Sequence, residues 1–163
     1  MSNAYNHHKP MKPFTSTLLI LTMLLAGCGS GNSDAPASSQ PQADPSGLSQ
    51  EQLEHGIGPI SAFDPGPLDA ALAAEGADFF KLKCSACHKM EGRYVGPELG
   101  AVANTRSPAY LMNMMLNPAE MIEKHPEAKK KFAEFMTPMP DQNLSEDEAR
   151  AILEYLRSEA EKR

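Results

Sequence analysis

The 163-residue sequence lacks tryptophan, and only 6% of its residues are aromatic. A small domain with so few aromatic side chains has little to fill its centre, so a buried prosthetic group would supply the missing apolar volume. Positive charge is also in short supply, because 21 acidic residues outweigh 15 basic residues and give a net charge of −6. This balance argues against nucleic acid as a partner. No segment has the pattern of a strand of useful length and no internal repeat is present, so we expect a nearly all-α domain.

Cysteine is scarce too, with three residues in the chain. Two of them belong to Cys84-Ser85-Ala86-Cys87-His88, the attachment signature of a c-type haem. The thiols add across the two vinyl groups, the spacing lets one helical turn span them, and the adjacent histidine can coordinate the iron. A redox-active dithiol or half of a zinc site would use the same spacing. Zinc would need two more ligands, and the chain has no second Cys-x-x-Cys.

The N-terminus resembles a secretory signal. Lys9 and Lys12 precede an apolar run at Phe14–Ala26 that only threonine and serine interrupt. A bilayer span needs about 20 residues, so this shorter run predicts a cleaved signal. The run ends in Leu25–Cys28, which resembles a bacterial lipobox, whose cysteine is diacylated and becomes the new N-terminus. An ordinary signal peptide followed by an unmodified Cys28 is the alternative.

The sequence therefore divides into three parts. Residues 1–27 are the expected lipoprotein signal peptide, residues 28–64 the lipidated Cys28 with a flexible tether and arm, and residues 65–163 the globular domain that carries the haem motif. The tether to about Ser49 is rich in Gly, Ser, Pro, Gln, Ala and Asp, so it cannot bury a core. Leu53–Phe63 contains glycine and proline, and we expect it to be an irregular arm that packs on the domain.

Export and lipidation would place the mature chain on the periplasmic or outer cell-surface side of a bacterial membrane. Several acyl chains on one cysteine give a stable anchor, whereas a single chain binds a membrane only marginally. Gly29 follows the cysteine, so an inner-membrane retention signal of the aspartate type is missing. This favours the outer membrane where two membranes exist, although the sequence leaves the choice open.

Helical periodicity and helix-end signals predict five helical segments in the domain. They are Leu68–Lys83, Pro108–Leu116, a short turn at Ala119–Lys124, Glu127–Phe135 and a last helix from Ser145 to about Ala160. Ser107 before Pro108 is a typical helix start, and Ser145 with Glu148 forms a capping box. Gly76 lies in the middle of the first helix, where glycine costs about 1 kcal/mol relative to alanine. Close approach of another helix would explain it.

Taken in order, these elements resemble those of class I c-type cytochromes over residues 66–160. The resemblance rests on a helix leading into Cys84–His88, a Gly-Pro-x-Leu loop at Gly96–Leu99, Met139-Pro140, and a final helix with a late aromatic residue, Tyr155. It implies an all-α cytochrome c fold, in which the N- and C-terminal helices cross around one covalently bound haem c. The extra helix around Asn117–Met136 departs mildly from the family, and its role is open.

The resemblance also implies particular contacts. Gly76 and Phe80 would meet Ile152 and Tyr155 where the two helices cross. The carbonyl of Pro97 would accept a hydrogen bond from Nδ1–H of His88, which fixes the ring and makes it a better donor to iron.

The expected haem site consists of Cys84 and Cys87 as covalent attachment points, with His88 and Met139 as axial iron ligands. Met139 lies between two prolines and before the last helix, so its loop can reach over the haem. Met136 is the main rival, and His125 is a further alternative, although we expect a solvated helix end there. The remaining methionines near helices are expected to pack in the interior or against the haem; these are Met112, Met114, Met115 and Met121.

Two further groups of polar residues lie near the haem motif in the sequence. The candidates to bind the haem propionates are Arg93, Tyr94, Arg106 and Tyr110. A second group either forms a positive rim that attracts an acidic partner or is a set of scattered solvated side chains; it comprises Lys81, Lys83, Lys89 and Arg93.

With histidine and methionine both bound, no iron position is open to oxygen or substrate, and the thioether raises the reduction potential. We therefore expect no enzyme but a monomeric electron carrier. It would move single electrons between a quinol-oxidising donor complex and a terminal oxidase or exported reductase, while its lipid holds it at the membrane. A haem-based ligand or redox sensor and an electron-entry subunit of a larger reductase or oxidase complex are the alternatives.

Overall fold

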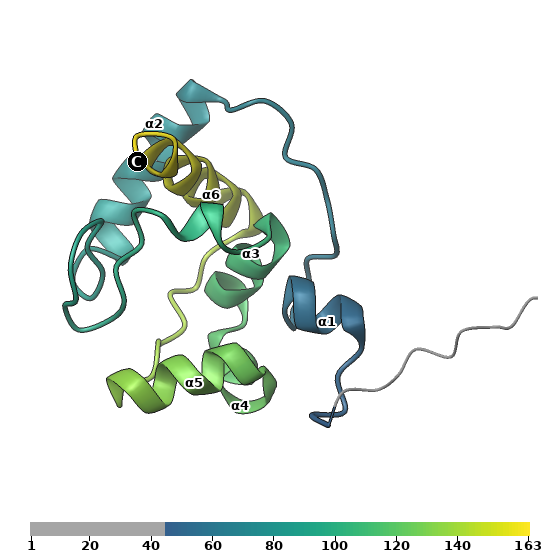
Figure 1. Ribbon diagram of the computed structural model, residues 1–163. Helices are drawn as coiled ribbons and strands as arrows, with labels where there is room; N and C mark the ends of the chain where they lie inside the picture. The colour runs from purple at the N-terminus through teal and green to yellow at the C-terminus, as the bar shows by residue number, and fades with distance from the viewer. Residues whose placement is uncertain (1–44) are drawn as a thin grey trace, which may run out of the picture. The chain divides into compact units, whose positions relative to one another are not determined.

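The computed structural model describes residues 45–163, and this part of the chain is helical without any strand (Figure 1). The elements are α1 (Gln50–His55), α2 (Ala70–Lys83), the 3-10 turn η1 (Val102–Asn104), α3 (Pro108–Leu116), α4 (Pro118–Lys124), α5 (Pro126–Phe135) and α6 (Glu146–Ala160). The all-α prediction is confirmed. The expected signal peptide and Cys28 lie outside the described residues, so they stay predictions.

Helix α2 begins where its first backbone N–H groups find an acceptor. The carboxylate of Asp69 accepts hydrogen bonds from the N–H groups of Ala71 and Leu72, at 2.9 and 3.0 Å. An aspartate at this N-cap position also suits the positive end of the helix dipole. The helix therefore starts two residues later than Leu68, and it runs on to the cysteine motif.

Helices α2 and α6 cross in direct backbone contact at Gly76 (Figure 1). A Cβ atom on Gly76 would lie only 1.9 Å from the carbonyl oxygen of Ala151 and 3.0 Å from the amide nitrogen of Ile152. One turn further on, the rings of Phe80 and Tyr155 pack with their centroids 5.3 Å apart. The expected reason for a mid-helix glycine is thus confirmed, since no side chain fits between the two backbones.

A buried carboxylate ties α6 to the start of α2. The side chain of Glu154 is fully buried, accepts a hydrogen bond from the backbone N–H of Asp69 at 3.1 Å, and pairs with Arg150 and Arg157. Burial alone would raise the pKa of Glu154, but the hydrogen bonds from Arg150, Asp69 and Arg157 outweigh it and hold the pKa below its usual value. The two arginines also donate to the carbonyls of Pro65 and Gly66, which fixes the chain entering α2.

The arm before the domain packs on it as expected, but it is not irregular throughout. Residues 50–55 form α1, which Ser49 and Gln52 cap with reciprocal side-chain hydrogen bonds. This capping box is visible in the sequence, so α1 could have been predicted. Ile57, after the helix, is buried in the same core as α3 and α6.

Buried polar side chains of α3 and of the α4–α5 junction hold the arm by its backbone. Asn113 is fully buried, donates to the carbonyls of His55 and Ile60 at 2.9 and 2.8 Å, and accepts from the N–H of Ile60 at 3.0 Å. His125 donates from Nε2 to the carbonyl of Leu53 at 3.1 Å. The arm therefore supplies hydrogen-bond partners that the domain alone would leave unsatisfied.

The prediction of a solvated helix end at His125 was wrong. Its side chain is 1% exposed, packs edge-on against the Tyr110 ring, and accepts at Nδ1 from the N–H of Glu127. The reason is tertiary, because the arm covers this position from 72 residues away in the sequence.

Candidate haem-binding site

The cysteine motif continues the last turn of α2. The N–H of Cys84 donates to the carbonyl of Phe80, and the N–H groups of Cys87 and His88 both donate to the carbonyl of Cys84, at 3.0 and 2.9 Å. The five residues of the motif therefore form a single helical turn. This is the backbone arrangement that the spacing of a covalent haem attachment requires.

The Cys84 thiol does not have the character of a redox nucleophile. Burial raises the pKa of the Cys84 thiol to about 11, and the nearby positive charge of Lys83 only partly opposes this. A reactive Cys-x-x-Cys needs a lowered thiol pKa. The zinc alternative finds no support either, because residues 45–163 contain no group of three or more His, Cys, Asp or Glu side chains placed to hold a metal ion.

His88 is oriented by the loop that follows it. Its Nδ1–H donates to the carbonyl oxygen of Pro97 at 2.9 Å, which fixes the tautomer and leaves Nε2 available as a ligand. The loop can approach so closely because position 96 is glycine. A Cβ atom there would lie 2.5 Å from Cε1 of His88.

One cavity of about 420 Å³ brings the predicted site residues together. Cys84, Cys87 and His88 line it, and so does Met139, which comes from the extended segment between α5 and α6. The remaining wall is largely apolar and includes Leu111, Met114, Met115, Ile152 and Leu156. Two thiols, an imidazole and a thioether facing one apolar cavity fit a covalently attached haem with soft axial ligands.

The methionines differ in their exposure and in whether they line the cavity. Met139 is half-buried and lines the cavity, whereas Met136 is 75% exposed and does not. Met112, Met115 and Met121 are buried packing residues. His125 does not line the cavity, and both of its ring nitrogens are already engaged.

Of the propionate candidates, the structure brings Arg106 and Tyr110 to the cavity but not Arg93 or Tyr94. Arg106 donates to the Glu127 carboxylate at 2.7 Å and lies over the Tyr110 ring, 5.2 Å from its centroid. This hydrogen bond lowers the pKa of Glu127, and burial raises the pKa of Tyr110.

Apolar residues that were not predicted from the sequence also line the cavity. Val95 contributes from the loop after His88, and Phe132 and Phe135 contribute from α5. Val95 is 40% exposed and Phe132 is 37% exposed. The three-residue spacing of the two phenylalanines on one helix face was the available signal.

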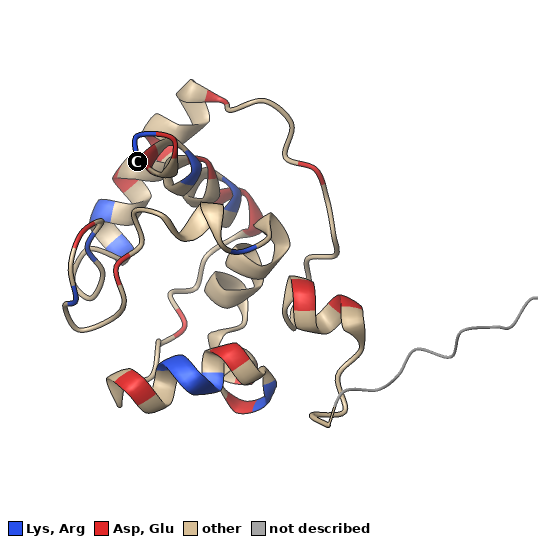
Figure 2. Cartoon of the chain, in the orientation of Figure 1, with Lys and Arg blue, Asp and Glu red and all other residues tan. Residues whose placement is uncertain are grey.

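The cations near the motif do not form a simple positive rim. Lys83 lies 3.6 Å from Glu148, and Arg93 lies 3.2 Å from Glu134. Lys89 lies over the Tyr94 ring. Figure 2 shows acidic segments on both sides of the basic segment of α5. Carboxylates therefore offset part of the positive charge of Lys83 and Arg93.

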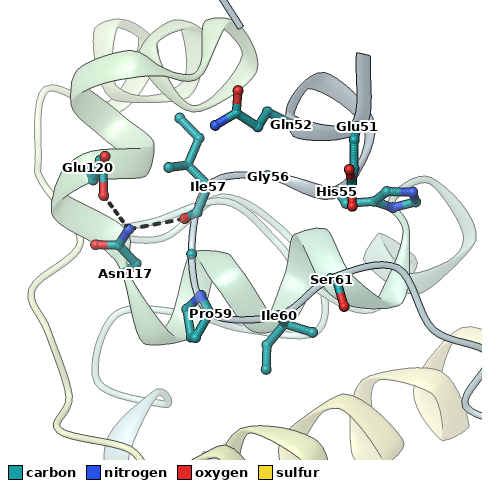
Figure 3. Close-up of a pocket in the computed structure, with 11 residues that line it drawn as sticks. Glu51, Gln52, His55, Gly56, Ile57, Pro59, Ile60, Ser61, Asn117 and Glu120 are labelled. Carbon is teal, nitrogen blue, oxygen red and sulfur yellow. Dashed lines mark hydrogen bonds between the residues drawn. The ribbon is translucent and has the colours of Figure 1, made fainter. Parts of the chain in front are cut away.

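A second cavity, of about 480 Å³, lies between the arm and α4 and has a different character (Figure 3). There the Asn117 side chain donates to the Ile57 carbonyl at 3.1 Å and to the Glu120 carboxylate at 2.8 Å. Its lining has no cysteine or methionine, so it offers no soft ligand for haem iron.

Known proteins share this fold and motif. The family model described as Cytochrome c matches residues 73–160. A solved structure of cytochrome c from Rhodothermus marinus is 47% identical, covering 69% of this chain and 98% of that chain with a TM-score of 0.66. An engineered cytochrome c from the same organism is 47% identical, covering 68% of this chain and 97% of that chain with a TM-score of 0.65. No curated protein sequence matches the chain.

The chain therefore belongs to the cytochrome c family, with the monohaem class I fold. Its cofactor is covalently bound haem c, and its general role is electron transfer. Domains of this family are typically exported.

Proposed function

We propose that this chain is a lipid-anchored monohaem cytochrome c that carries single electrons between components of a respiratory chain. The observation that carries the proposal is the shared cavity of Cys84, Cys87, His88 and Met139. In it, the cysteines would attach the haem, and Nε2 of His88 and the sulfur of Met139 would bind the iron.

The protein residues would hold the site unchanged between the two redox states. Pro97 fixes the His88 ring through its carbonyl, and the glycine before it permits that contact. With haem bound, the apolar wall would limit the access of water to the iron, which would keep reorganisation on electron transfer small. The bound haem supplies the one-electron chemistry, and with both axial positions filled it offers no site for a substrate.

The proposed place of action is a bacterial membrane surface. Residues 1–27 would be removed and Cys28 would carry the lipid, on the periplasmic or outer cell-surface side. Among residues 45–163, no helix has the length and apolar character needed to cross a membrane. The proposed partners are a quinol-oxidising donor complex and a terminal oxidase or exported reductase.

The test is expression of the full chain in a bacterial host that matures c-type cytochromes. We expect one haem per mature chain by mass, a sulfur-to-iron charge-transfer band at long wavelength in the oxidised form, and no carbon monoxide binding at neutral pH in the reduced form. Carbon monoxide binding without that band would contradict a carrier and favour a ligand sensor.

The anchor is tested separately with Cys28→Ser. We expect this variant to leave the membrane fraction while its haem spectrum is unchanged, because Cys28 has no part in the proposed haem site. Retention of the variant in membranes would contradict the lipid anchor.

A further inference from the structure

The two sides of the cavity mouth are joined by Arg93. This residue belongs to the loop that follows His88, and its partners lie at the end of α5, which leads to Met139. One guanidinium nitrogen donates to the Glu134 carboxylate at 3.2 Å, and the other donates to the Glu134 backbone carbonyl at 2.8 Å. The guanidinium carbon also lies 4.0 Å from the centre of the Phe135 ring. The contact therefore connects the histidine side of the site with the methionine side.

Three contacts on one guanidinium distinguish this bridge from an ordinary surface ion pair. An exposed pair alone contributes little to stability. Here the guanidinium also donates to a carbonyl in the last turn of α5 and lies over an aromatic ring, so it makes three kinds of contact at one helix end. The ring of Phe135 itself lines the haem cavity.

The bridge acts where the chain turns toward Met139. Helix α5 ends at Phe135, and Met136 follows in the left-handed region with φ of 54°. From there an extended segment leads to Met139, with no helix or strand to hold it. The position of the end of α5 therefore determines where this segment starts.

We propose that Arg93 is a positioning residue for the sixth iron ligand. By holding the end of α5 against the loop that follows His88, it keeps Met139 in place and closes the mouth of the cavity to added ligands. This inference rests on the proposed ligation by His88 and Met139.

The test is an imidazole titration of the oxidised, haem-loaded full-length protein, with the sulfur-to-iron charge-transfer band as a second readout. Imidazole must displace Met139, so its apparent affinity rises with the fraction of molecules in which the methionine has left the iron. We expect Arg93→Gln to bind imidazole roughly tenfold more tightly and to lose the band at a lower temperature. Glu134→Gln keeps the carbonyl and ring contacts, so we expect a smaller change of about twofold.

Arg163→Gln is the matched control. Arg163 pairs with Glu91 of the same loop, also at 3.2 Å, and this ion pair joins the loop to the last residue of the sequence instead of to α5. We expect its imidazole affinity to equal that of the wild type.

The role of Arg93 would be overturned if the wild type and Arg93→Gln bound imidazole with equal affinity. It would also be overturned if Arg163→Gln showed the same increase in imidazole affinity as Arg93→Gln. A wild-type protein without the charge-transfer band would instead overturn the assignment of Met139 and, with it, the positioning role.

Discussion

The two sides of the haem cavity are held in different ways. On the His88 side, α2 crosses α6 with the Gly76 and Ala151 backbones in contact, and Pro97 hydrogen-bonds the imidazole. On the Met139 side, an extended segment runs from α5 to α6 without secondary structure. Its contacts with α2 include a 3.4 Å hydrogen bond from Lys83 to the Gln142 carbonyl. One side is thus tied to the helix crossing, whereas the other is an irregular segment between two helices.

Because of this difference, we expect substitutions on the His88 side to change the stability of the fold and substitutions on the Met139 side to change the ligation of the iron. Changes at the helix crossing should lower the free energy of unfolding, because they disturb buried backbone and side-chain packing. Changes near Met139 should alter the occupancy of the sixth ligand position with little effect on folding. Because the attachment motif lies at the end of α2, the helix crossing also holds His88 in place. A rigidly held ligand suits an electron carrier.

The largest effect is expected for Gly76→Ala. Helix propensity alone predicts a gain of about 1 kcal/mol, but the added Cβ would meet the Ala151 carbonyl at 1.9 Å. We expect a loss of about 3 kcal/mol in the free energy of unfolding, measured by denaturant titration of the haem-loaded protein. The control is Ala74→Gly on the exposed face of α2, with an expected loss of about 1 kcal/mol. A more stable Gly76→Ala protein would contradict the close crossing.

A somewhat smaller effect is expected for Glu154→Gln, which should destabilise the protein by about 2–3 kcal/mol at pH 7, since it leaves Arg150 and Arg157 without a buried carboxylate. The pKa of Glu154 lies below its usual value of 4.5 in the folded state. Its contribution is therefore present above pH 4.5 and is lost as the pH falls through the folded pKa. Thermal melts across this range should show a shallower acid dependence in the variant. An identical acid dependence would show that this carboxylate does not stabilise the crossing.

Local signals in the sequence predicted much of the fold. Ser107 before Pro108 and the Ser145 capping box gave correct helix starts, because caps depend on residues within one turn. Gly76 indicated the crossing because an interior glycine needs a packing reason. His125 was misplaced and the Arg93–Glu134 bridge was missed, since both depend on partners 72 and 41 residues away.

The haem site likewise contains a part that depends on neighbouring residues and a part that depends on distant ones. The attachment motif is continuous in sequence and folds as a single turn, so it could be recognised without the structure. The choice between Met139 and Met136 could not be settled in the same way, because it depends on the direction of the chain after α5. Met136 ends α5 in a left-handed conformation and its side chain is exposed, whereas Met139 lines the cavity.

The smallest of the stability effects is expected for Asn113→Ala, which tests whether the arm belongs to the domain. The change removes three hydrogen bonds to the arm backbone and should cost about 2 kcal/mol. Hydrogen exchange at residues 55–60 should speed up, while exchange at the α2–α6 crossing stays slow. Asn104→Ala, which removes one 3.3 Å bond to the Ala160 carbonyl, is the control. Unchanged exchange in the arm would show that Asn113 does not hold it.

The most direct measurement is the long-wavelength absorption of the oxidised, haem-loaded protein in two methionine variants. We predict that Met139→Ala abolishes the sulfur-to-iron charge-transfer band and allows added imidazole to bind, whereas Met136→Ala leaves both properties as in the wild type. A band that survives in Met139→Ala and disappears in Met136→Ala would contradict the proposed ligation of the iron.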